Sequence, residues 1–358
     1  MNLGYHDDWE SARRHLEAWW ANDALDRAAL QVDAPRQHPL PGPDAPSAPQ
    51  DLTRRWLDAD YRVAAADYDM RQTFFGGEAL PKFWPKLGPG VAAAYLGVEP
   101  VFAEGTVWFD QDPRGWNEIA PAFDPENRWW RATLDLVRAG VQASDGNFFV
   151  GVTDIGGVVD IEASLRGPTD LLTDLVDAPH EVKRVRDQIV PLWLRWYEEQ
   201  ERIIHQRLEG SSCWLGVWSP GRTYNIQCDF CCMISPAHFE EFVAPELEAL
   251  CSWLDHVTFH LDGPGALRHL DRLLAIPGLR GIQWSPGAGA PSAVGWLPML
   301  RKVQAAGKLL HLYDDIANAE AILRELSPKG LMISVGGCRT EQEARDLLRQ
   351  AQGWYRKP

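Results

Sequence analysis

From residue 145 onward, short apolar runs alternate with longer amphipathic stretches, and this alternation most restricts what the chain can fold into. The runs are apolar without interruption, which is typical of strands in a parallel sheet that is covered on both faces. We predict strands at residues 148–154, 213–218, 256–261, 279–284, 308–313 and 331–335. An earlier short strand has the sequence ALQVD, and an eighth is expected around residues 224–229.

The stretches between these strands carry helix signals. Ser235 and Pro236 form a capping pair at the start of one helix, and Pro245 should kink that helix. Thr340 and Glu343 fit a capping box at the start of the last helix. We predict helices at residues 9–20, 171–203 (in two pieces split near Pro179), 235–254, 265–274, 297–306, 317–326 and 340–352.

Strands that alternate with helices in this number favour a (β/α)8 TIM barrel within the α/β class. No G-x-G-x-x-G motif opens a helix after a strand, which argues against a dinucleotide-binding fold. We predict one domain over residues 1–358, with an N-terminal helical extension and the first barrel elements in residues 1–144 and regular β/α units in residues 145–358. The proline-rich residues 35–51 are predicted to form a surface loop.

Composition excludes several classes of partner. The formal net charge is −15, so neither a nucleic-acid partner nor an anionic membrane surface is expected. Apolar runs stay far below the ~20 residues that cross a bilayer, and the N-terminal sequence lacks an apolar signal-peptide core. Six cysteines in 358 residues are too few for a disulfide scaffold. These features predict a cytoplasmic protein.

In such barrels, the reactive side chains lie where strands end and loops begin. Asp154, Asn225 and Gln283 are candidates for hydrogen bonds that orient a substrate. Aromatic residues near strand ends could enclose a methylated cation or stack on a sugar or planar substrate. The full set of predicted substrate-binding residues is Asp154, Trp218, Arg222, Tyr224, Asn225, Gln283, Trp284 and Tyr313.

His260 and Asp262 lie two residues apart in a predicted strand, so both side chains point to the same face. Cys338 follows two glycines and precedes a capped helix, whose positive end should make the thiol more acidic. Together the three could form an open zinc site with one vacant position, which would ionise a thiol for alkyl transfer. The alternative is structural: a hydrogen-bonded strand histidine and a small buried cysteine.

A second metal motif is not expected at the cysteine cluster of residues 228–232, because no matching cysteine pair lies at zinc-ribbon distance. Asp229 is the candidate reactive group of this loop.

Three segments, DFCCMISPAHFEEFVAPELEAL, VTFHLDGPGALRHLDRLLAIPGLRGIQW and GGCRTEQEARDLLRQA, resemble the uroporphyrinogen decarboxylase superfamily in their sequence and order. The resemblance covers residue 148 to the C-terminus. It implies a TIM barrel, because that superfamily comprises barrel decarboxylases and zinc-dependent methyltransferases that act on thiols or corrinoid proteins. Its most specific part is Asp229 followed by Ile-Ser-Pro at residues 234–236.

The two branches of that superfamily imply different sites. The decarboxylases hold an acidic tetrapyrrole with an Arg-Gln-Ala-Gly-Arg segment, of which residues 70–76 keep only Arg71. The methyltransferases use a histidine, a thiol two residues later and a cysteine near the last strand. His260 and Cys338 match that pattern, whereas Asp262 replaces the middle thiol.

The leading hypothesis is therefore a zinc-dependent methyltransferase that acts on a small methylated substrate with a thiol or corrinoid-protein acceptor, with His260, Asp262 and Cys338 as ligands. One alternative is a metal-independent decarboxylase or lyase of a small carboxylic acid, in which Asp229 or Asp262 stabilises a protonated intermediate. Another is a barrel that binds a small molecule without catalysis. The resemblance is compatible with a homodimer.

Overall fold

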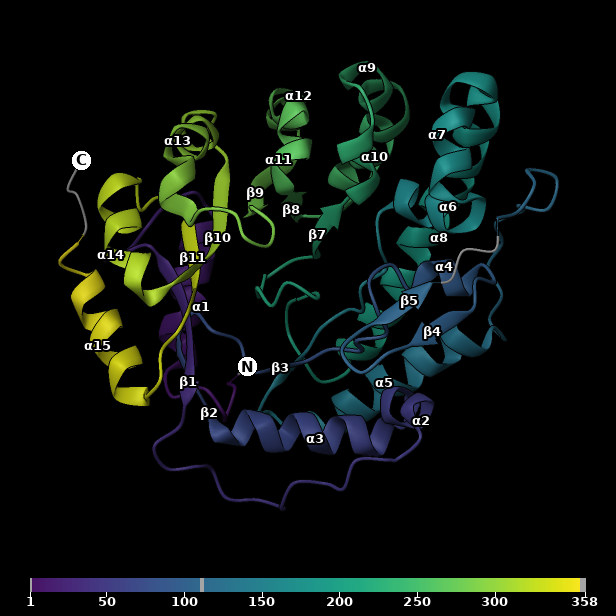
Figure 1. Cartoon of the computed structure of the whole chain (residues 1–358). Helices are drawn as coiled ribbons and strands as arrows, with labels where there is room; N and C mark the ends of the chain where they lie inside the picture. The colour runs from purple at the N-terminus through teal and green to yellow at the C-terminus, as the bar shows by residue number, and fades with distance from the viewer. Residues whose placement is uncertain (1, 110–112, 355–358) are drawn as a thin grey trace.

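A central sheet of seven strands organises the computed structural model, which describes residues 2–109 and 113–354 (Figure 1). Neighbouring strands are parallel throughout, except that β2 runs antiparallel to β1. In spatial order the strands are β2 (Thr73–Gly77), β1 (Ala29–Pro35), β11 (Leu331–Gly336), β10 (Leu309–Asp315), β9 (Leu279–Ser285), β8 (His256–Asp262) and β7 (Thr223–Gln227).

The α/β class and the mostly parallel sheet are confirmed, and six of the eight predicted strands lie in this sheet. Of the other two predicted strands, one is much shorter than predicted and the other is not a strand. Of residues 148–154 only β6 (Phe149–Val150) is a strand, and it pairs with β3 (Lys82–Phe83). Residues 213–218 contain no strand, because Gly216 adopts a φ of +79°, which a strand cannot accommodate. A further small sheet pairs β4 (Pro100–Phe102) with β5 (Val107–Phe109).

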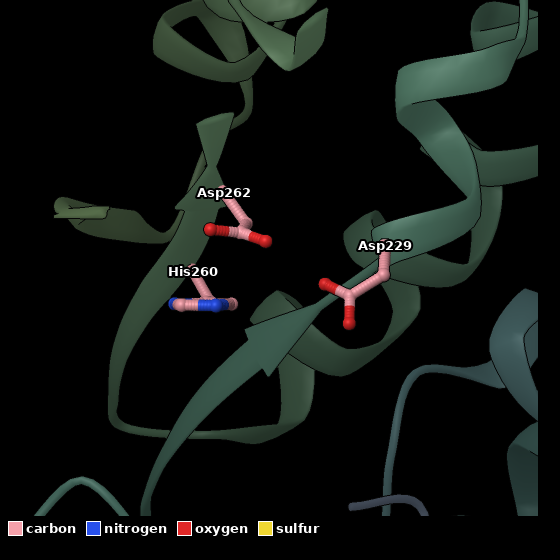
Figure 2. Close-up of side chains that lie close together, drawn as sticks. All are labelled: Asp229, His260 and Asp262. Atoms are coloured by element: carbon pink, nitrogen blue, oxygen red, sulfur yellow. The ribbon is translucent and has the colours of Figure 1, made fainter. Parts of the chain in front are cut away.

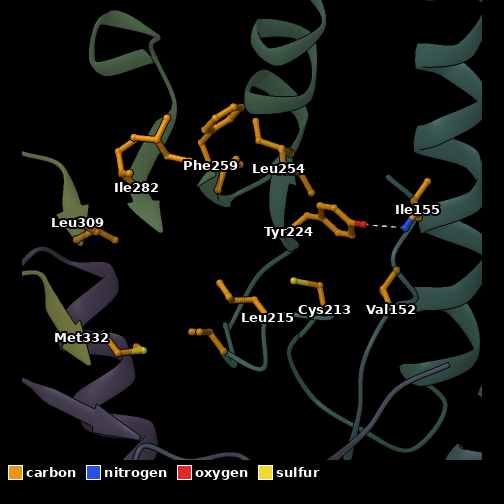
Figure 3. Packing of buried hydrophobic residues seen from close by; sticks show 14 of the residues in the cluster. Val152, Ile155, Cys213, Leu215, Tyr224, Leu254, Phe259, Ile282, Leu309 and Met332 are labelled. Atoms are coloured by element: carbon orange, nitrogen blue, oxygen red, sulfur yellow. Dashed lines mark hydrogen bonds between the residues drawn. The ribbon is translucent and has the colours of Figure 1, made fainter. Parts of the chain in front are cut away.

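These irregular segments lie between the two ends of the sheet. The N–H of Val152 donates to the carbonyl of Ser212 at 2.9 Å, and Nε2 of Gln31 in β1 donates to the carbonyl of Gly216 at 2.9 Å. Figure 3 shows Val152, Cys213 and Leu215 near Tyr224 of β7. Among the described residues, strand pairing does not join β7 to β2 or β1, so closure of the sheet into a barrel stays a prediction.

Helices surround the sheet on its outer side (Figure 1). The C-terminal half supplies α9 (Pro236–His238), α10 (Ala244–Trp253), α11 (Gly263–Ala266), α12 (Leu270–Ala275), α13 (Leu297–Ala305), α14 (Ile316–Glu325) and α15 (Glu341–Ala351). The preceding part supplies α1 (Trp9–Trp20), α2 (Leu52–Leu57), α3 (Ala59–Gln72), α4 (Ala92–Tyr95), α5 (Arg128–Ser144), α6 (Val158–Arg166), α7 (Pro168–Asp177) and α8 (Pro179–Ile204). The short helical turns are η1 (Asp229–Met233), η2 (Phe239–Val243), η3 (Leu267–His269) and η4 (Ala293–Trp296).

The helix boundaries that were predicted from proline residues agree with the structure. The split near Pro179 separates α7 from α8, and Pro245 lies in the first turn of α10, directly after the π-helical turn η2. Pro245 has no N–H to donate to the preceding turn. The carbonyl of Glu241 accepts from the Arg186 guanidinium at 3.1 Å instead. Half of the predicted capping box is confirmed: Thr340 Oγ1 accepts the N–H of Glu343 at 3.1 Å, whereas the Glu343 carboxylate accepts the N–H of Arg339 rather than that of Thr340.

Helix α1 covers the edge of the sheet where the parallel strands begin. Trp19 donates through Nε1 to the carbonyl of Gly330, just before β11, at 3.0 Å. Arg280, at the start of β9, donates to the carbonyl of Trp20 at 2.7 Å. The opposite edge, where the strands end, is therefore the one left for a site.

Residues 36–51 contain no helix or strand, as predicted for the proline-rich loop, whose first predicted residue, Pro35, instead ends β1. No helix among the described residues combines the length and apolar character needed to span a membrane.

Candidate functional site

Strand β8 and the turn after β7 bring three ionisable side chains together. Val257, Phe259 and Leu261 are fully buried on one face of β8. Strand alternation therefore places His260 and Asp262 together on the other face. Asp229 begins η1, directly beyond neighbouring β7. Figure 2 shows the Asp229 carboxylate facing His260 and Asp262.

The spacing of these groups suits a metal ion. One ligand atom each from Asp229, His260 and Asp262 lies within 4.8 Å of the other two. Metal–ligand bonds of about 2.1 Å in a tetrahedral site space the ligand atoms roughly 3.4 Å apart, so side-chain movements of about 1 Å would complete the geometry. The donor set of one imidazole and two carboxylates fits a divalent ion such as zinc, and is harder than a set that contains thiolates.

A chain of hydrogen bonds fixes the His260 ring. Nδ1 of His260 is hydrogen-bonded to Oε1 of Gln283 on the adjacent β9. Because that oxygen only accepts, Nδ1 carries the proton and Nε2 is left free to bind a metal or accept a proton. Asn225 donates to the same Oε1 at 3.4 Å, and Thr258 donates to Asn225 at 2.7 Å. The Trp214 ring meets the imidazole edge-on, with centroids 5.5 Å apart.

Burial raises the pKa of Asp229; the nearby Asp262 carboxylate raises it further, whereas His260 lowers it. The Asp229 side chain still reaches solvent, as a group inside a hollow can. A pocket of about 270 Å³ lies beside it, bordered by Asp160 and Phe230 among others. Asp160 accepts the backbone N–H groups of Asp229 and Phe230 at 3.0 and 2.9 Å. Its own pKa is raised to about 7, first by burial and then by the Asp229 charge.

Cys338 lies outside this group of three. It follows β11, which is separated from β8 by β9 and β10 in the sheet. The expected increase in its acidity is wrong: burial raises the pKa of the thiol, and the Glu343, Asp315 and Asp33 carboxylates raise it further. Burial is the largest cause, and in addition Glu343 lies at the helix N-terminus, where it accepts the N–H of Arg339 at 2.7 Å.

Asp154 and Tyr224 form a buried pair next to α6. The Tyr224 hydroxyl donates to Asp154 at 3.3 Å. It also accepts the N–H of Ile155 at 2.7 Å (Figure 3). Burial raises the pKa of Asp154 to about 7. Tyr224 is fully buried and packs edge-on against Trp193, so its ring cannot enclose a substrate without rearrangement.

The remaining predicted binding residues separate into two groups. Asn225 and Gln283 are buried and contact each other, as described, and Tyr313 is 47% exposed beyond them. Trp284 alternates with Gln283 along β9 and packs against Trp296, with centroids 5.0 Å apart, so it points away from His260.

Trp218 and Arg222 lie at the opposite edge of the sheet. Trp218 accepts a hydrogen bond through its carbonyl from Trp20 of α1 at 2.9 Å. Arg222 precedes β7 and pairs with Asp255, just before β8, at 3.2 Å. Both were chosen because residues 213–218 were expected to be a strand, and that premise is wrong.

Three further residues, at the edge where the parallel strands end, were not among the predicted ones: Asp33, Lys82 and Asp160. Asp33 lies near the end of the predicted ALQVD strand, so the strand-end criterion would have found it. Asp160 and Lys82 gave no comparable signal, because their neighbours come from distant parts of the chain.

The chain superposes on the solved structure of a methyltransferase from Methanosarcina mazei with a TM-score of 0.63. The likeness covers 96% of this chain and 98% of that one, at 13% sequence identity. The two proteins share a fold. No protein-family model matches the sequence, and no curated protein matches it. A shared fold does not determine the function. The function of this protein depends on the side chains at its own site.

Proposed function

We propose that this protein is a methyltransferase that binds a divalent metal ion, with zinc the first candidate, through Asp229, His260 and Asp262. The observation that carries the proposal is the convergence of these three groups, within 4.8 Å, where parallel strands end. The shared fold with a methyltransferase is consistent with it. Cys338 is left out of the proposed ligand set because it is not part of the cluster.

The chain's own residues would do the following. Gln283 keeps the proton of His260 on Nδ1 and thereby presents Nε2 to the ligand. Asp160 holds the backbone of Asp229 in place through two N–H groups. A zinc ion bound there would keep an acceptor thiol ionised, which is the form that attacks a methyl group. The methyl donor is a small molecule, and the acceptor is a free thiol or a corrinoid protein.

We further propose that the sheet is the wall of a TIM barrel. The irregular residues 148–154 and 213–218 would take the places of the missing strands, since Gly216 accepts a hydrogen bond from Gln31 of β1 at 2.9 Å and the carbonyl of Thr153 accepts one from Tyr224 of β7 at 3.5 Å.

The test is transfer of a labelled methyl group from candidate methylated donors to a thiol, with and without a chelator. Activity that disappears on chelation, returns with zinc and is absent in Asp229→Ala supports the proposal. Methyl transfer that persists in chelated enzyme would contradict it.

A specific observation favours one alternative, a metal-independent decarboxylase or lyase. The pKa values of Asp154 and Asp160 are raised to about 7, and that of Asp229 is raised as well. Carboxyl groups that are protonated near neutral pH can protonate the carbanion left when a substrate carboxylate departs as carbon dioxide. Carbon dioxide release that survives chelation but is lost in Asp229→Asn would favour this alternative.

A further inference from the structure

A second hollow of about 410 Å³ lies at the same edge of the sheet, beyond the ends of β1, β10 and β11. It is lined by Gln31, Asp33, Ala79, Leu80, Lys82, Leu215, Gly216, Tyr313, Ser334, Val335 and Gly336. A hollow of this size accommodates a small molecule, and the proposed function does not yet use it.

Strand register places this hollow on the same face as the metal-ligand candidates. His260 pairs with Gln283, and Gln283 pairs with His311 of β10. Paired residues share a face, and so do residues two apart. His311 is hydrogen-bonded through Nε2 to Ser334 at 2.7 Å, and Ser334 donates to Gln31 at 2.6 Å. A continuous polar row therefore connects His260 with the lining of the hollow.

One wall of the hollow is negative. Burial within the hollow raises the pKa of Asp33 to about 6, so the carboxylate is mostly ionised at neutral pH, and its side chain still reaches solvent. Tyr313, in the same lining, is 47% exposed. A carboxylate beside an accessible aromatic ring is a combination that recognises an ammonium group.

Another wall is positive. Lys82 donates through Nζ to the carbonyls of Cys213 and Trp214 at 2.6 and 2.9 Å. An ammonium has three N–H donors, so one remains. Burial lowers the pKa of Lys82 to about 8, which leaves it mostly charged at neutral pH. Gly216 lies beside it, and a Cβ atom there would stand 3.4 Å from Nζ. The absence of a side chain keeps the approach to Nζ open.

We propose that this hollow binds a small zwitterion of the betaine type, with its ammonium against Asp33 and Tyr313 and its carboxylate on Lys82. The idea that the methylated ammonium serves as the methyl donor rests on the proposed function. Binding of the zwitterion does not rest on it.

The test is calorimetric titration of the full-length protein with trimethylammonio carboxylates that have one, two or three methylenes between the charges. Two analogues remove one charge each: choline lacks the carboxylate, and 3,3-dimethylbutanoate is the carbon isostere of glycine betaine. We expect at least one zwitterion to bind, and each single-charge analogue to bind at least tenfold more weakly. Equal binding of either analogue, or no binding of any zwitterion, overturns the proposal.

Variants separate the two walls. Asp33→Asn should weaken the zwitterion at least tenfold and leave 3,3-dimethylbutanoate unaffected, whereas Asp60→Asn, an exposed position in α3, should change neither. Lys82→Met should weaken the zwitterion at least tenfold and leave choline binding unaffected. If it does not fold, because two carbonyls lose their donor, the choline measurement on the unmodified protein still decides the role of the positive wall.

Zwitterion titration, combined with metal analysis and zinc titration of the same protein, distinguishes this inference from the proposed function. Zwitterion binding by protein that holds no metal and fails to take up zinc supports the hollow and contradicts the metal-dependent methyltransferase. Metal bound by Asp229, His260 and Asp262 without zwitterion binding does the opposite.

Discussion

Gln283 accepts a hydrogen bond from Nδ1 of His260 across two neighbouring strands, and this contact decides which imidazole nitrogen is available at the site. The acceptor oxygen is held in turn by Asn225. Gln283 is therefore a positioning residue that would act on a metal through His260.

Replacing Gln283 should weaken metal binding without unfolding the protein. In Gln283→Leu the ring loses its acceptor, and we expect zinc affinity to fall by roughly 10- to 100-fold, the usual cost of removing such a partner. Competition with a chromophoric chelator measures it. Gln283→Glu keeps an acceptor oxygen and should restore most of the affinity. If Gln283→Leu binds zinc as tightly as the unmodified protein, the contact has no part in the site.

Cys338 should be dispensable for metal binding. Its thiol has a raised pKa and lies outside the cluster of Asp229, His260 and Asp262. We expect Cys338→Ala to retain the full metal stoichiometry, measured by inductively coupled plasma mass spectrometry after gel filtration. Loss of the metal in this variant would restore the thiol ligand that the sequence predicted and refute the carboxylate set.

Glu246 should make the protein less stable at high pH. It is 1% exposed in α10, and burial and the nearby Asp160 charge hold its pKa well above the usual value. A carboxyl whose pKa is raised in the folded state favours folding at low pH, and this contribution is lost as pH rises toward the folded-state pKa.

Glu246→Gln removes that ionisation. We therefore expect its Tm to exceed that of the unmodified protein by roughly 2–6 °C at pH 8, and by less at pH 5. Thermal unfolding followed by circular dichroism measures both. Glu248→Gln is the matched control, because Glu248 lies on the same helix and is 46% exposed. An equal Tm change at both pH values would contradict a buried, protonated Glu246.

The strands and helices of the second half could be read from the sequence because each is set by local features. Val257, Phe259 and Leu261 mark β8, and proline marks the starts of α8 and α10. Residues 213–218 were misjudged, because an apolar run looks like a strand whether or not its glycine takes a positive φ. The first 144 residues gave little. Helices α3 and α5 are capped by Asp58 and Asn127, but neither start carries the proline or the capping-box glutamate that located the later helices.

The candidate site was predictable only in part, and for a geometric reason. His260 and Asp262 are close because they are two residues apart in a strand. The approach of Asp229 depends on β7 pairing with β8, which periodicity does not reveal. Cys338 was expected beside them because strand ends share an edge. The sequence does not give lateral distance along that edge, and β8 to β11 spans three strand spacings, or roughly 14 Å.

The central claim is that Asp229, His260 and Asp262 hold a metal ion, and the most direct measurement is the metal content of protein purified without chelator. We predict close to one equivalent of a divalent metal in the unmodified protein and in His180→Ala, which removes an exposed imidazole from α8. We predict less than a tenth of an equivalent in His260→Ala. Metal-free unmodified protein that fails to take up zinc on titration, or His260→Ala that keeps its metal, would contradict the account.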